Sequence, residues 1–411
     1  MEQSAAGKLP VDITRIIMGV LVSEREMETL HAGGRVCSSW RYGARPYKFR
    51  HIRLDSQQCV DSLDDLLASV PDIAGYIQQV RFHGKKPEEH RGTRGSGWIL
   101  DAPLQLASKL PVLRTIRIHE LFDIQDKPSS RFFEGLASFT SVTQLHLLHC
   151  SCREDFVFRC AGVLPNLRHF EVCNPATLPL GFVDTSALDA SYPLVPDSMQ
   201  LTTLRCMHAR YDQDKLVHWL VTAPHRASLR HLAVDIDDVS LISLSRALRE
   251  VGPNLERLEL QVYFPPGYVW RRGRGAISAE KLLSPCTALK DFTVGFTGAT
   301  DMYSALPLLR GVRARCIERV RINLIHFIGG GSFPNLTELY AILQGENFKS
   351  MQTARIVYVG PLSLETFRAH MTSRLPAALE PRMRWTHTTY PGLIFDDFWS
   401  DVGPCRINAL T

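Results

Sequence analysis

Hydrophobic residues recur along this chain with two different periods. In roughly the first 50 residues they stand three or four positions apart, which is the spacing of one helix face. From about residue 75 onward they follow the template Leu-x-x-Leu-x-Leu, with Ile, Val and Phe as substitutes. The alternating apolar positions of this template are typical of a short strand. The pattern therefore predicts a helical region followed by a repetitive one.

The helical region begins with an apolar stripe that predicts a helix over residues 10–22. Pro10 occupies a position where a first helical turn tolerates proline, and Asp12 places a negative charge near the positive end of the helix. The stripe consists of Ile13, Ile16, Ile17, Val20 and Leu21.

Two further short helices are predicted before residue 50. The segment EMETLHAG forms the second, which ends at Gly33 and Gly34. RVCSSWRYGA then places Val36, Cys37 and Trp40 on one face of the third. Three short helices thus occupy about 45 residues.

The repetitive region contains ten matches to the template, at intervals of 19 to 37 residues. Their first positions are Ile77, Leu113, Val142, Leu167, Leu204, Leu229, Leu255, Leu289, Ile317 and Leu336. Prolines precede four of the matches and indicate turns. The clearest helix between matches is SLISLSRALREVG, with Ser240 as a possible N-cap and Gly252 as its stop.

Each repeat therefore reads as helix, turn and short strand. Neither an amphipathic helix of three turns nor a single strand can bury its apolar face alone, so such units stack side by side. We predict an α/β fold in which a short N-terminal three-helix domain precedes an irregular leucine-rich-repeat solenoid with a parallel concave sheet. The C-terminal residues, rich in aromatics, are interpreted as a cap over the last apolar layer.

Residues between the apolar positions of each strand point toward the concave surface. They form a polar lining with both signs of charge, which favours a protein or peptide partner over RNA. The lining includes Arg117, His119, His146, Glu171, His208, Glu259, Gln261, Arg321, Asn323 and Tyr340. Seven of these are the predicted substrate-binding residues: Arg117, His146, Glu171, His208, Glu259, Arg321 and Tyr340.

Composition narrows the function classes further. The 411 residues contain 47 basic and 42 acidic side chains, and this net charge of +5 does not by itself predict a nucleic-acid partner. No apolar run approaches the length of a membrane span, and the start MEQSAAGKLPVD lacks the apolar core of a signal peptide. Ten cysteines without a C-x-x-C pair indicate reduced thiols. We expect a cytoplasmic or nuclear protein.

The N-terminal residues resemble an F-box, through Leu9 and Pro10, the stripe with Ile13 and Ile17, and the segment VCSSW. The repeats resemble the leucine-rich repeats that often follow this module, and YKFRHIRL is similar to the strand that comes next in fungal members. The resemblance implies four segments: a disordered tail (1–7), an F-box-like domain (8–55), the repeat domain (56–360) and the cap (361–411).

The resemblance also implies a function. F-box proteins are non-catalytic receptors of SCF-type ubiquitin ligases: the helices bind a Skp-type adaptor, which connects to a cullin and a RING-bound conjugating enzyme, and the repeats hold a protein substrate. The residues implied at the adaptor are Leu9, Pro10, Ile13, Ile16, Ile17, Val36, Cys37 and Trp40. An interaction scaffold without any role in ubiquitin transfer is the alternative.

Candidate chemistry is weak elsewhere, so we predict no catalytic residues, no metal and no cofactor. Cys37 lies beside apolar neighbours, which favours packing over a reactive thiol. The cluster HLLHCSC has an awkward spacing for zinc, and Cys150 stands at the ninth position of its repeat, where such repeats bond the turn backbone. The aromatic and basic stretch 263–275 is typical both of a binding loop and of a plain surface loop.

Overall fold

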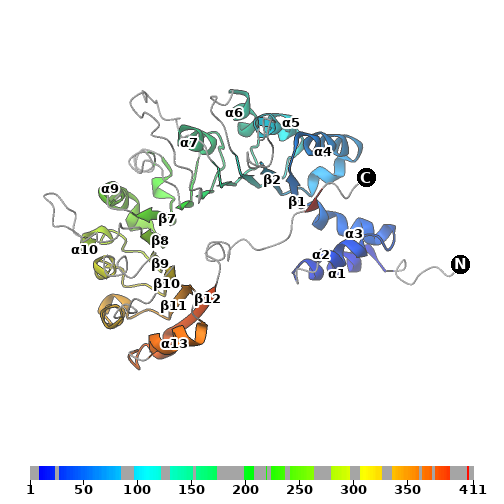
Figure 1. Ribbon diagram of the computed structural model, residues 1–411. Coiled ribbons are helices and arrows are strands. Elements are labelled where there is room, and N and C mark those ends of the chain that lie inside the picture. Colours follow the sequence, from blue (N-terminus) through cyan, green and yellow to red (C-terminus); the bar gives the residue numbers. More distant parts are fainter. Residues whose placement is uncertain are drawn as a thin grey trace. The chain divides into compact units, whose positions relative to one another are not determined.

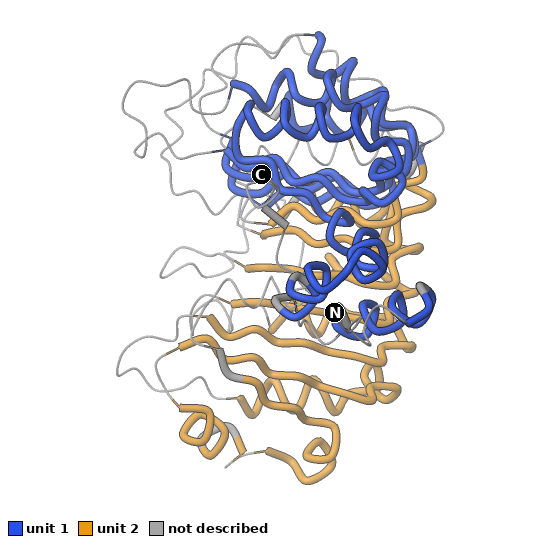
Figure 2. The backbone as a smooth tube through the Cα atoms, turned by 90° about the vertical axis from the view of Figure 1, so that its right-hand side faces the viewer, with its two compact units in different colours: residues 1–199, 399–411 blue, residues 200–398 orange. Residues whose placement is uncertain are grey.

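The chain divides into two compact units, residues 1–199 with 399–411 and residues 200–398 (Figure 2). In each unit, parallel strands form a sheet with helices on one of its faces (Figure 1). The computed structural model describes residues 9–23, 27–84, 97–121, 130–150, 154–173, 199–207, 219, 224–236, 241–262, 279–296, 306–325, 336–360, 363–372, 375–388 and 405–406.

The first unit begins with three short helices, α1 (Val11–Ser23), α2 (Met27–Gly33) and α3 (Ser38–Lys48). Their core contains one residue of each helix, Met18, Leu30 and Ala44, all fully buried. Leu21, Trp40 and Tyr47 pack against this core. The three helices predicted from the sequence are therefore present, and α2 ends at the predicted glycine.

A close crossing of α1 and α3 depends on Gly43. A Cβ atom at this position would lie 2.8 Å from Cγ2 of Thr14, which is fully buried. The Thr14 hydroxyl in turn donates to the Pro10 carbonyl at the start of α1 (3.2 Å). The face of α1 that carries Thr14 and Met18 is thus the inner face of the bundle.

The sheet of the first unit has the order β13-β1-β2-β3-β4-β5, and every pairing in it is parallel. Its strands are β1 (His51–Leu54), β2 (Gln79–His83), β3 (Thr115–His119), β4 (Gln144–Leu148), β5 (His169–Cys173) and β13 (Cys405–Arg406). The α-helices between them are α4 (Gln57–Ser69), α5 (Ala102–Leu106), α6 (Ser130–Ala137) and α7 (Glu154–Gly162). Short 3-10 helices are η2 (Pro71–Gly75), η4 (Gly97–Leu100) and η5 (Ala107–Lys109).

The second unit repeats this arrangement with the order β6-β7-β8-β9-β10-β11-β12, again parallel throughout. Its strands are β6 (Thr203–Met207), β7 (His231–Ile236), β8 (Arg257–Val262), β9 (Asp291–Phe296), β10 (Arg319–Ile325), β11 (Thr353–Val359) and β12 (Met383–Thr388). Its α-helices are α9 (Leu241–Val251), α10 (Ala279–Leu282), α12 (Thr337–Leu343) and α13 (Leu364–Thr372). Its 3-10 helices are η7 (Pro224–Ala227), η8 (Gly252–Asn254), η9 (Glu346–Phe348) and η10 (Glu380–Arg382).

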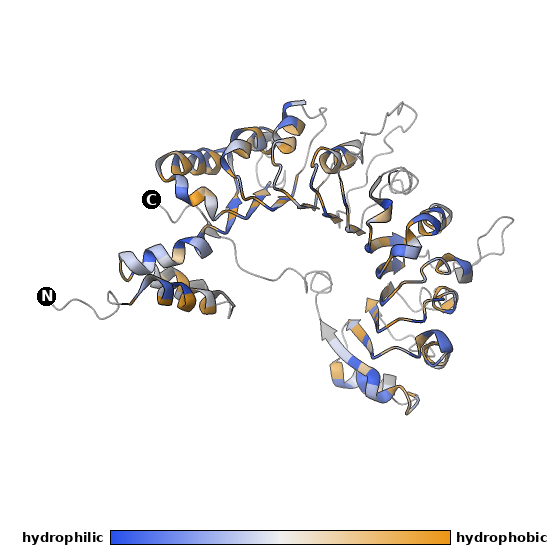
Figure 3. Ribbon diagram, turned by 180° about the vertical axis from the view of Figure 1, so that it is seen from behind, coloured by the Kyte–Doolittle hydropathy of each residue, from blue (hydrophilic) through white to orange (hydrophobic). Residues whose placement is uncertain are grey.

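Equivalent residues of successive strands pair directly, so side chains form rows across each sheet. One apolar row of the first unit is Ile52, Val80, Ile116, Leu145 and Phe170, and its counterpart in the second unit is Leu204, Leu232, Leu258, Phe292 and Val320. All ten side chains are buried. Polar and apolar positions alternate along much of the strands (Figure 3), although Val357 and Val359 of β11 form a buried apolar cluster with Ile325 of β10.

The helices supply the other half of the apolar core. Phe132 of α6 stacks on Phe156 of α7 with ring centroids 5.4 Å apart. In the second unit Phe367 of α13 stacks on Tyr358 of β11 (4.4 Å) and meets Trp385 of β12 edge to face (6.0 Å). Helices therefore cover the face that carries the apolar rows, as expected for units that cannot bury that face alone.

The predicted α/β class with a parallel sheet is confirmed. In neither unit does the strand order close on itself, which is compatible with a solenoid of α/β repeats. Eight of the ten template matches lead into a strand at the predicted position, namely those that begin at Ile77, Leu113, Val142, Leu167, Leu229, Leu255, Leu289 and Ile317. The other two matches were interpreted wrongly.

The match at Leu336 is not a strand. Residues 337–343 form helix α12, and its Tyr340 is 1% exposed, so the prediction that Tyr340 lines a polar strand face is wrong. The apolar spacing of LTELYAIL also fits one face of a helix, which is the structure that forms. The strand of this repeat is β11, about 15 residues later.

The repeat predicted to begin at Leu204 begins three residues earlier in the structure. Leu204 pairs with Leu232 of β7, and Leu232 occupies the fourth position of its own template. The repeat therefore begins at Leu201, with Leu204 and Cys206 as its next apolar members. His208, predicted to bind substrate, lies outside the described residues.

The predicted segment boundaries after residues 7, 55 and 360 stay predictions. Within the proposed cap, α13, η10 and β12 continue the repeat beside β11, while residues 405–406 pair with β1 of the first unit. Among the described helices, none is long and apolar enough to span a membrane.

Candidate functional site

Two surfaces of the described chain combine features that indicate binding: the polar face of the sheets and the outer side of the N-terminal helices. On the sheets, five predicted substrate-binding residues belong to one row position in their units. These are Arg117 on β3, His146 on β4, Glu171 on β5, Glu259 on β8 and Arg321 on β10. All lie opposite the buried apolar rows.

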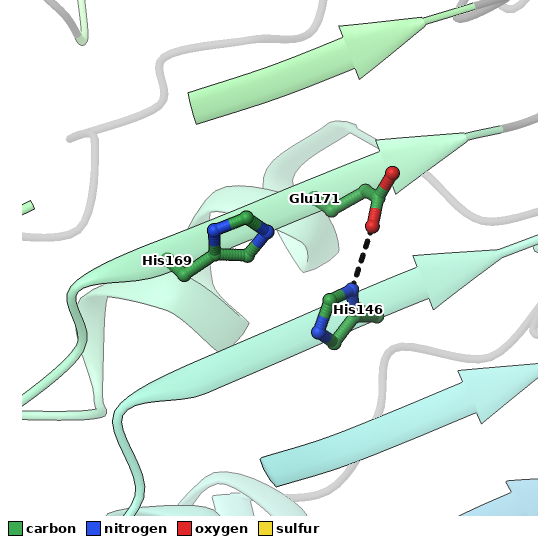
Figure 4. A group of neighbouring side chains, drawn as sticks. All are labelled: His146, His169 and Glu171. Atoms are coloured by element: carbon green, nitrogen blue, oxygen red, sulfur yellow. Dashed lines mark hydrogen bonds and ion pairs between the residues drawn. The ribbon is translucent and has the colours of Figure 1, made fainter. Parts of the chain in front are cut away.

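In the first unit the register brings three of these residues together. Arg117 pairs with His146, and His146 pairs with Glu171. Nδ1 of His146 lies 2.7 Å from Oε2 of Glu171, and both side chains are buried. Figure 4 shows His169, two residues before Glu171 on the same strand, beside this pair. The two imidazole centroids are 5.2 Å apart.

The cluster of His146, His169 and Glu171 is the arrangement in the described residues that comes nearest to a metal centre. Its three ligand atoms lie within 4.8 Å of one another, and two imidazoles with a carboxylate suit zinc or iron by ligand type. Arg117 stands next to His146 in the register, however, and its charge opposes a further cation. We therefore interpret the cluster as a buried hydrogen-bonded pair with a neighbouring imidazole.

Basic residues dominate the same row on the strands before Arg117. Arg53 of β1 pairs with Arg81 of β2, and Arg81 pairs with Arg117. Nε of Arg53 donates to Asp55 (2.6 Å), and Arg117 is only 7% exposed. Three neighbouring strands thus place positive charges side by side, with Arg53 and Arg81 half-buried and Arg117 buried.

The pKa values of two histidines near this row, His51 and His119, are lowered. Burial, followed by the charges of Arg50, Arg117 and Arg81, lowers the pKa of His51 to about 4. Burial, followed by the charges of Arg81, His83 and Arg117, lowers the pKa of His119 to about 2, with His149 adding to the effect. Both imidazoles are therefore neutral at physiological pH.

In the second unit Glu259 is surrounded by two arginines and a histidine. Arg257 Nη2 lies 2.5 Å and His231 Nε2 3.1 Å from Oε1 of Glu259, and Arg205 Nη2 lies 3.4 Å from its Oε2. Burial raises the pKa of Glu259, but the hydrogen bond from His231 and the charge of Arg205 outweigh it and lower the pKa overall. Burial lowers the pKa of His231 despite the partner.

The N-terminal residues are divided between the bundle core and its surface. Ile13, Ile16 and Val36 are exposed by 43%, 63% and 52%. Pro10 is also exposed, whereas Leu9, Ile17 and Cys37 are half-buried. Trp40, predicted to contact a partner, packs against the core of the bundle.

One detail of the helical prediction is wrong. Val36 and Cys37 precede α3, with Cys37 at its N-cap in an extended conformation (φ −160°), so they do not share a helix face with Trp40. Ile13, Ile16 and Val20 of the α1 stripe point outward, while Thr14 and Met18 are fully buried.

Among the other candidates from the sequence, one has a structural role and two lie outside the described residues. The Cys150 thiol contacts the carbonyls of Ile118 and Leu148 (3.4 Å each), as predicted for its repeat position, and burial raises its pKa to about 12. Cys152 and the aromatic stretch 263–275 are not among the described residues.

Sequence reasoning missed Arg355 of β11 and Arg384 of β12. The first could have been found, because MQTARI fits the template with Met351, Ala354 and Ile356 as its apolar members. The second lies between Met383 and Trp385, in a segment that was assigned to the cap. In the register, Arg321 pairs with Arg355 and Arg355 pairs with Arg384.

Comparison with known proteins does not place the chain in a family. No family model matches it, and no curated protein matches it at a significant level. The function therefore has to be argued from the residues themselves.

Proposed function

We propose that this protein is the non-catalytic substrate receptor of an SCF-type ubiquitin ligase in the cytoplasm or nucleus. In this proposal α1 to α3 bind a Skp-type adaptor, and the polar faces of the sheets bind a protein substrate. The adaptor connects to the cullin and its RING-bound conjugating enzyme. The contribution to ubiquitin transfer is positional, because holding a substrate lysine near an activated thioester raises its effective concentration.

The observation that carries the proposal is the apolar outer side of the helical bundle. Eight large hydrophobic side chains are exposed in the described part of the chain. Five of them belong to the bundle, namely Ile13, Ile16, Val20, Val36 and Tyr42, and the other three are Leu104, Val112 and Leu364. Exposed apolar residues concentrated in one small domain indicate an interaction site.

The spacing of these residues defines a face that another subunit can cover. Ile13, Ile16 and Val20 are three and four residues apart, so they form one stripe along α1. Such a stripe suits a groove in a helical partner, where apolar anchors give most of the binding energy. Polar residues on the sheets, by contrast, suit a partner recognised through charge and hydrogen bonds.

Capture of a recombinant Skp-type adaptor by the full-length chain tests the proposal. We expect a complex with the unaltered protein and at least about tenfold weaker binding after Ile13→Asp together with Ile16→Asp, because two exposed anchors become charged. Both side chains are exposed, so the helix content measured by circular dichroism should not change.

The matched control is Leu104→Asp together with Val112→Asp, which places the same charges on exposed apolar positions outside the bundle. This variant should bind the adaptor as the unaltered chain does. Trp40 is unsuitable for the test because its substitution disturbs the bundle core.

An adaptor that binds the Asp variant as tightly as the unaltered chain contradicts the proposed surface. Failure of the unaltered chain to bind any Skp-type adaptor contradicts the ligase role and leaves the plain interaction scaffold. Affinity purification from cells after proteasome inhibition extends the test, because a receptor should carry both adaptor and substrate.

A further inference from the structure

Three arginines occupy equivalent positions on the last three strands of the second unit. Arg321 of β10 pairs with Arg355 of β11, which pairs with Arg384 of β12, and we call this set the arginine row. Neighbouring strands lie about 4.8 Å apart, so the row extends over about 10 Å. Its direction is across the strands.

The arginine row lies on the face opposite the helices. The flanking residues Val320, Ile322, Ala354, Ile356 and Met383 are buried, and successive side chains of a strand point to opposite faces. On the helix side, Trp385 of β12 contacts Phe367 of α13. Arg321 and Arg355 are half-buried, and Arg384 is exposed, so the row is open to solvent.

Each side chain of the arginine row has at least one neutral hydrogen-bond partner. Nε of Arg321 donates to Oδ1 of Asn323, and Nε of Arg355 donates to Oγ1 of Thr386, both at 2.9 Å. Nη1 of Arg384 donates to the carbonyls of Pro381 (3.1 Å) and Met383 (2.9 Å). The contacts of Arg355 and Arg384 fix their guanidinium groups without neutralising their charge.

Where a carboxylate is close, an arginine of the same sheet forms an ion pair with it. Arg319, two residues before Arg321 on β10, binds Asp291 of β9 through two bonds of 2.6 Å. Glu259 of β8 likewise pairs with Arg257 on its own strand and with Arg205 of β6, and it contacts the His231 imidazole of β7. Within the described residues, the contacts of Arg355 and Arg384 include no carboxylate.

We propose that the arginine row binds an extended acidic segment of a protein partner. A guanidinium presents paired N–H donors that match a carboxylate, and the neighbouring charges of Arg355 and Arg384 repel each other until an anion lies between them. Because its charges are spread over about 10 Å, the row fits a ligand whose negative charges are also spread out.

An extended segment crossing the strands presents such charges naturally. Alternate residues of an extended chain lie about 6.6 Å apart on one side, so two acidic residues separated by one other fit within the length of the row. The inference rests on the proposed function in taking the ligand to be a protein segment, and it narrows the class of substrate that the sheet would hold.

Fluorescence anisotropy with a labelled peptide of alternating Glu and Ser residues tests the inference on the full-length chain without any adaptor. We expect saturable binding at physiological ionic strength, and none for the same peptide with Gln in place of Glu. Arg355→Gln together with Arg384→Gln should weaken binding at least about tenfold. Neither substitution leaves a buried acid behind, so thermal unfolding should stay close to that of the unaltered chain.

Two further variants separate a defined site from general charge attraction. Arg368→Gln on α13 removes an exposed positive charge from the helix layer and should leave binding unchanged. Lysines at positions 355 and 384 should restore only part of the affinity, because lysine keeps the charge but lacks the planar pair of donors.

Equal binding by the unaltered chain and the double Gln variant overturns the inference. Tighter binding of inorganic phosphate, or of a peptide with a single phosphoserine, than of the Glu peptide overturns it as well, because the row would then read a compact anion. Adaptor capture is measured separately. A failure of peptide binding leaves the proposed docking of α1 intact, and a failure of adaptor capture leaves the arginine row intact.

Discussion

Some charged side chains on the sheets have partners of opposite charge, and others have neutral partners. Glu259 is surrounded by His231, Arg205 and Arg257, whereas Arg355 is held by a hydroxyl. A buried carboxylate stays ionised when hydrogen bonds and nearby positive charges stabilise the ionised form by more than burial destabilises it. Glu259 is thus expected to stabilise the fold, while Arg355 is available for a ligand.

Glu259→Gln should lower the free energy of unfolding by about 3 kcal/mol at neutral pH, since it leaves buried cations without their carboxylate. The pKa of Glu259 is lowered in the folded state, so its contribution is present above the unfolded value of 4.5 and is lost as the pH falls below it. Urea unfolding at several pH values measures the difference between the two proteins.

The control for this substitution is Glu256→Gln. Glu256 is 46% exposed and pairs with Lys290 (2.9 Å), so its loss should cost well under about 1 kcal/mol. Equal costs at positions 256 and 259 would contradict the role of the buried cluster.

His119 should stay neutral in the folded protein far below the usual range of histidine. Burial and the neighbouring positive charges lower its pKa from the ordinary histidine value of 6.5 to about 2. Between these values the unfolded chain binds a proton that the folded chain does not, so stability is full above pH 6.5 and declines as the pH falls. His119→Gln should reduce this decline by about 1.4 kcal/mol per pH unit between pH 6 and 4.

Two measurements check this expectation. Urea unfolding gives the slope for each protein, and the NMR signal of the His119 ring in the unaltered chain should show no titration down to pH 5. A midpoint near pH 6.5 would contradict the lowered pKa.

At the scale of elements, close contact between helices depends on particular glycines. Gly135 of α6 is buried against α5, where an added Cβ would lie 2.5 Å from the backbone nitrogen of Leu104. Backbone atoms cannot move aside as a flexible side chain can. The sequence gives no sign of this contact, because Gly135 stands inside an otherwise amphipathic helical segment.

Gly135→Ala should destabilise the protein by about 1–3 kcal/mol, because overpacking exceeds the gain of about 1 kcal/mol in helix propensity. Thermal or urea unfolding measures it. Gly75→Ala is the matched control, since nothing lies within 4 Å of its added Cβ. A neutral or stabilising effect at position 135 would show that α5 and α6 can separate without cost.

At the scale of the whole molecule, each repeat contacts mainly its neighbours in sequence order. Such proteins lose stability locally when a terminal repeat is removed. The C-terminal segment supplies two terminal strands: β12 pairs with β11 in the second unit, and β13 pairs with β1 in the first.

Truncation after residue 360 should therefore weaken hydrogen-exchange protection at β11 and β1 and leave β8 protected. Exchange measured by mass spectrometry on the full-length and truncated chains tests this. A uniform loss of protection across both units would indicate a single cooperative body instead of repeats that respond locally.

The arrangement of repeats was largely readable from the sequence, whereas the candidate sites were not. Alternating apolar residues located eight strands, because a half-buried strand imposes its period on neighbours in the sequence. The same local signal misassigned Tyr340, since LTELYAIL fits a helix face equally well. Arg321 was placed on the polar face, but its partners Arg355 and Arg384 lie in later repeats.

The sequence by itself determined the α/β class, the three N-terminal helices and eight of the strands, through the periods of two and about 3.6 and the stops at glycine and proline. Only the tertiary structure decided which side of α1 stays outside the bundle and which polar residues become neighbours in the register. The physical reason is the range of the forces involved. A residue and its near neighbours set local conformation, whereas exposure and pairing depend on packing between residues that are far apart in the chain.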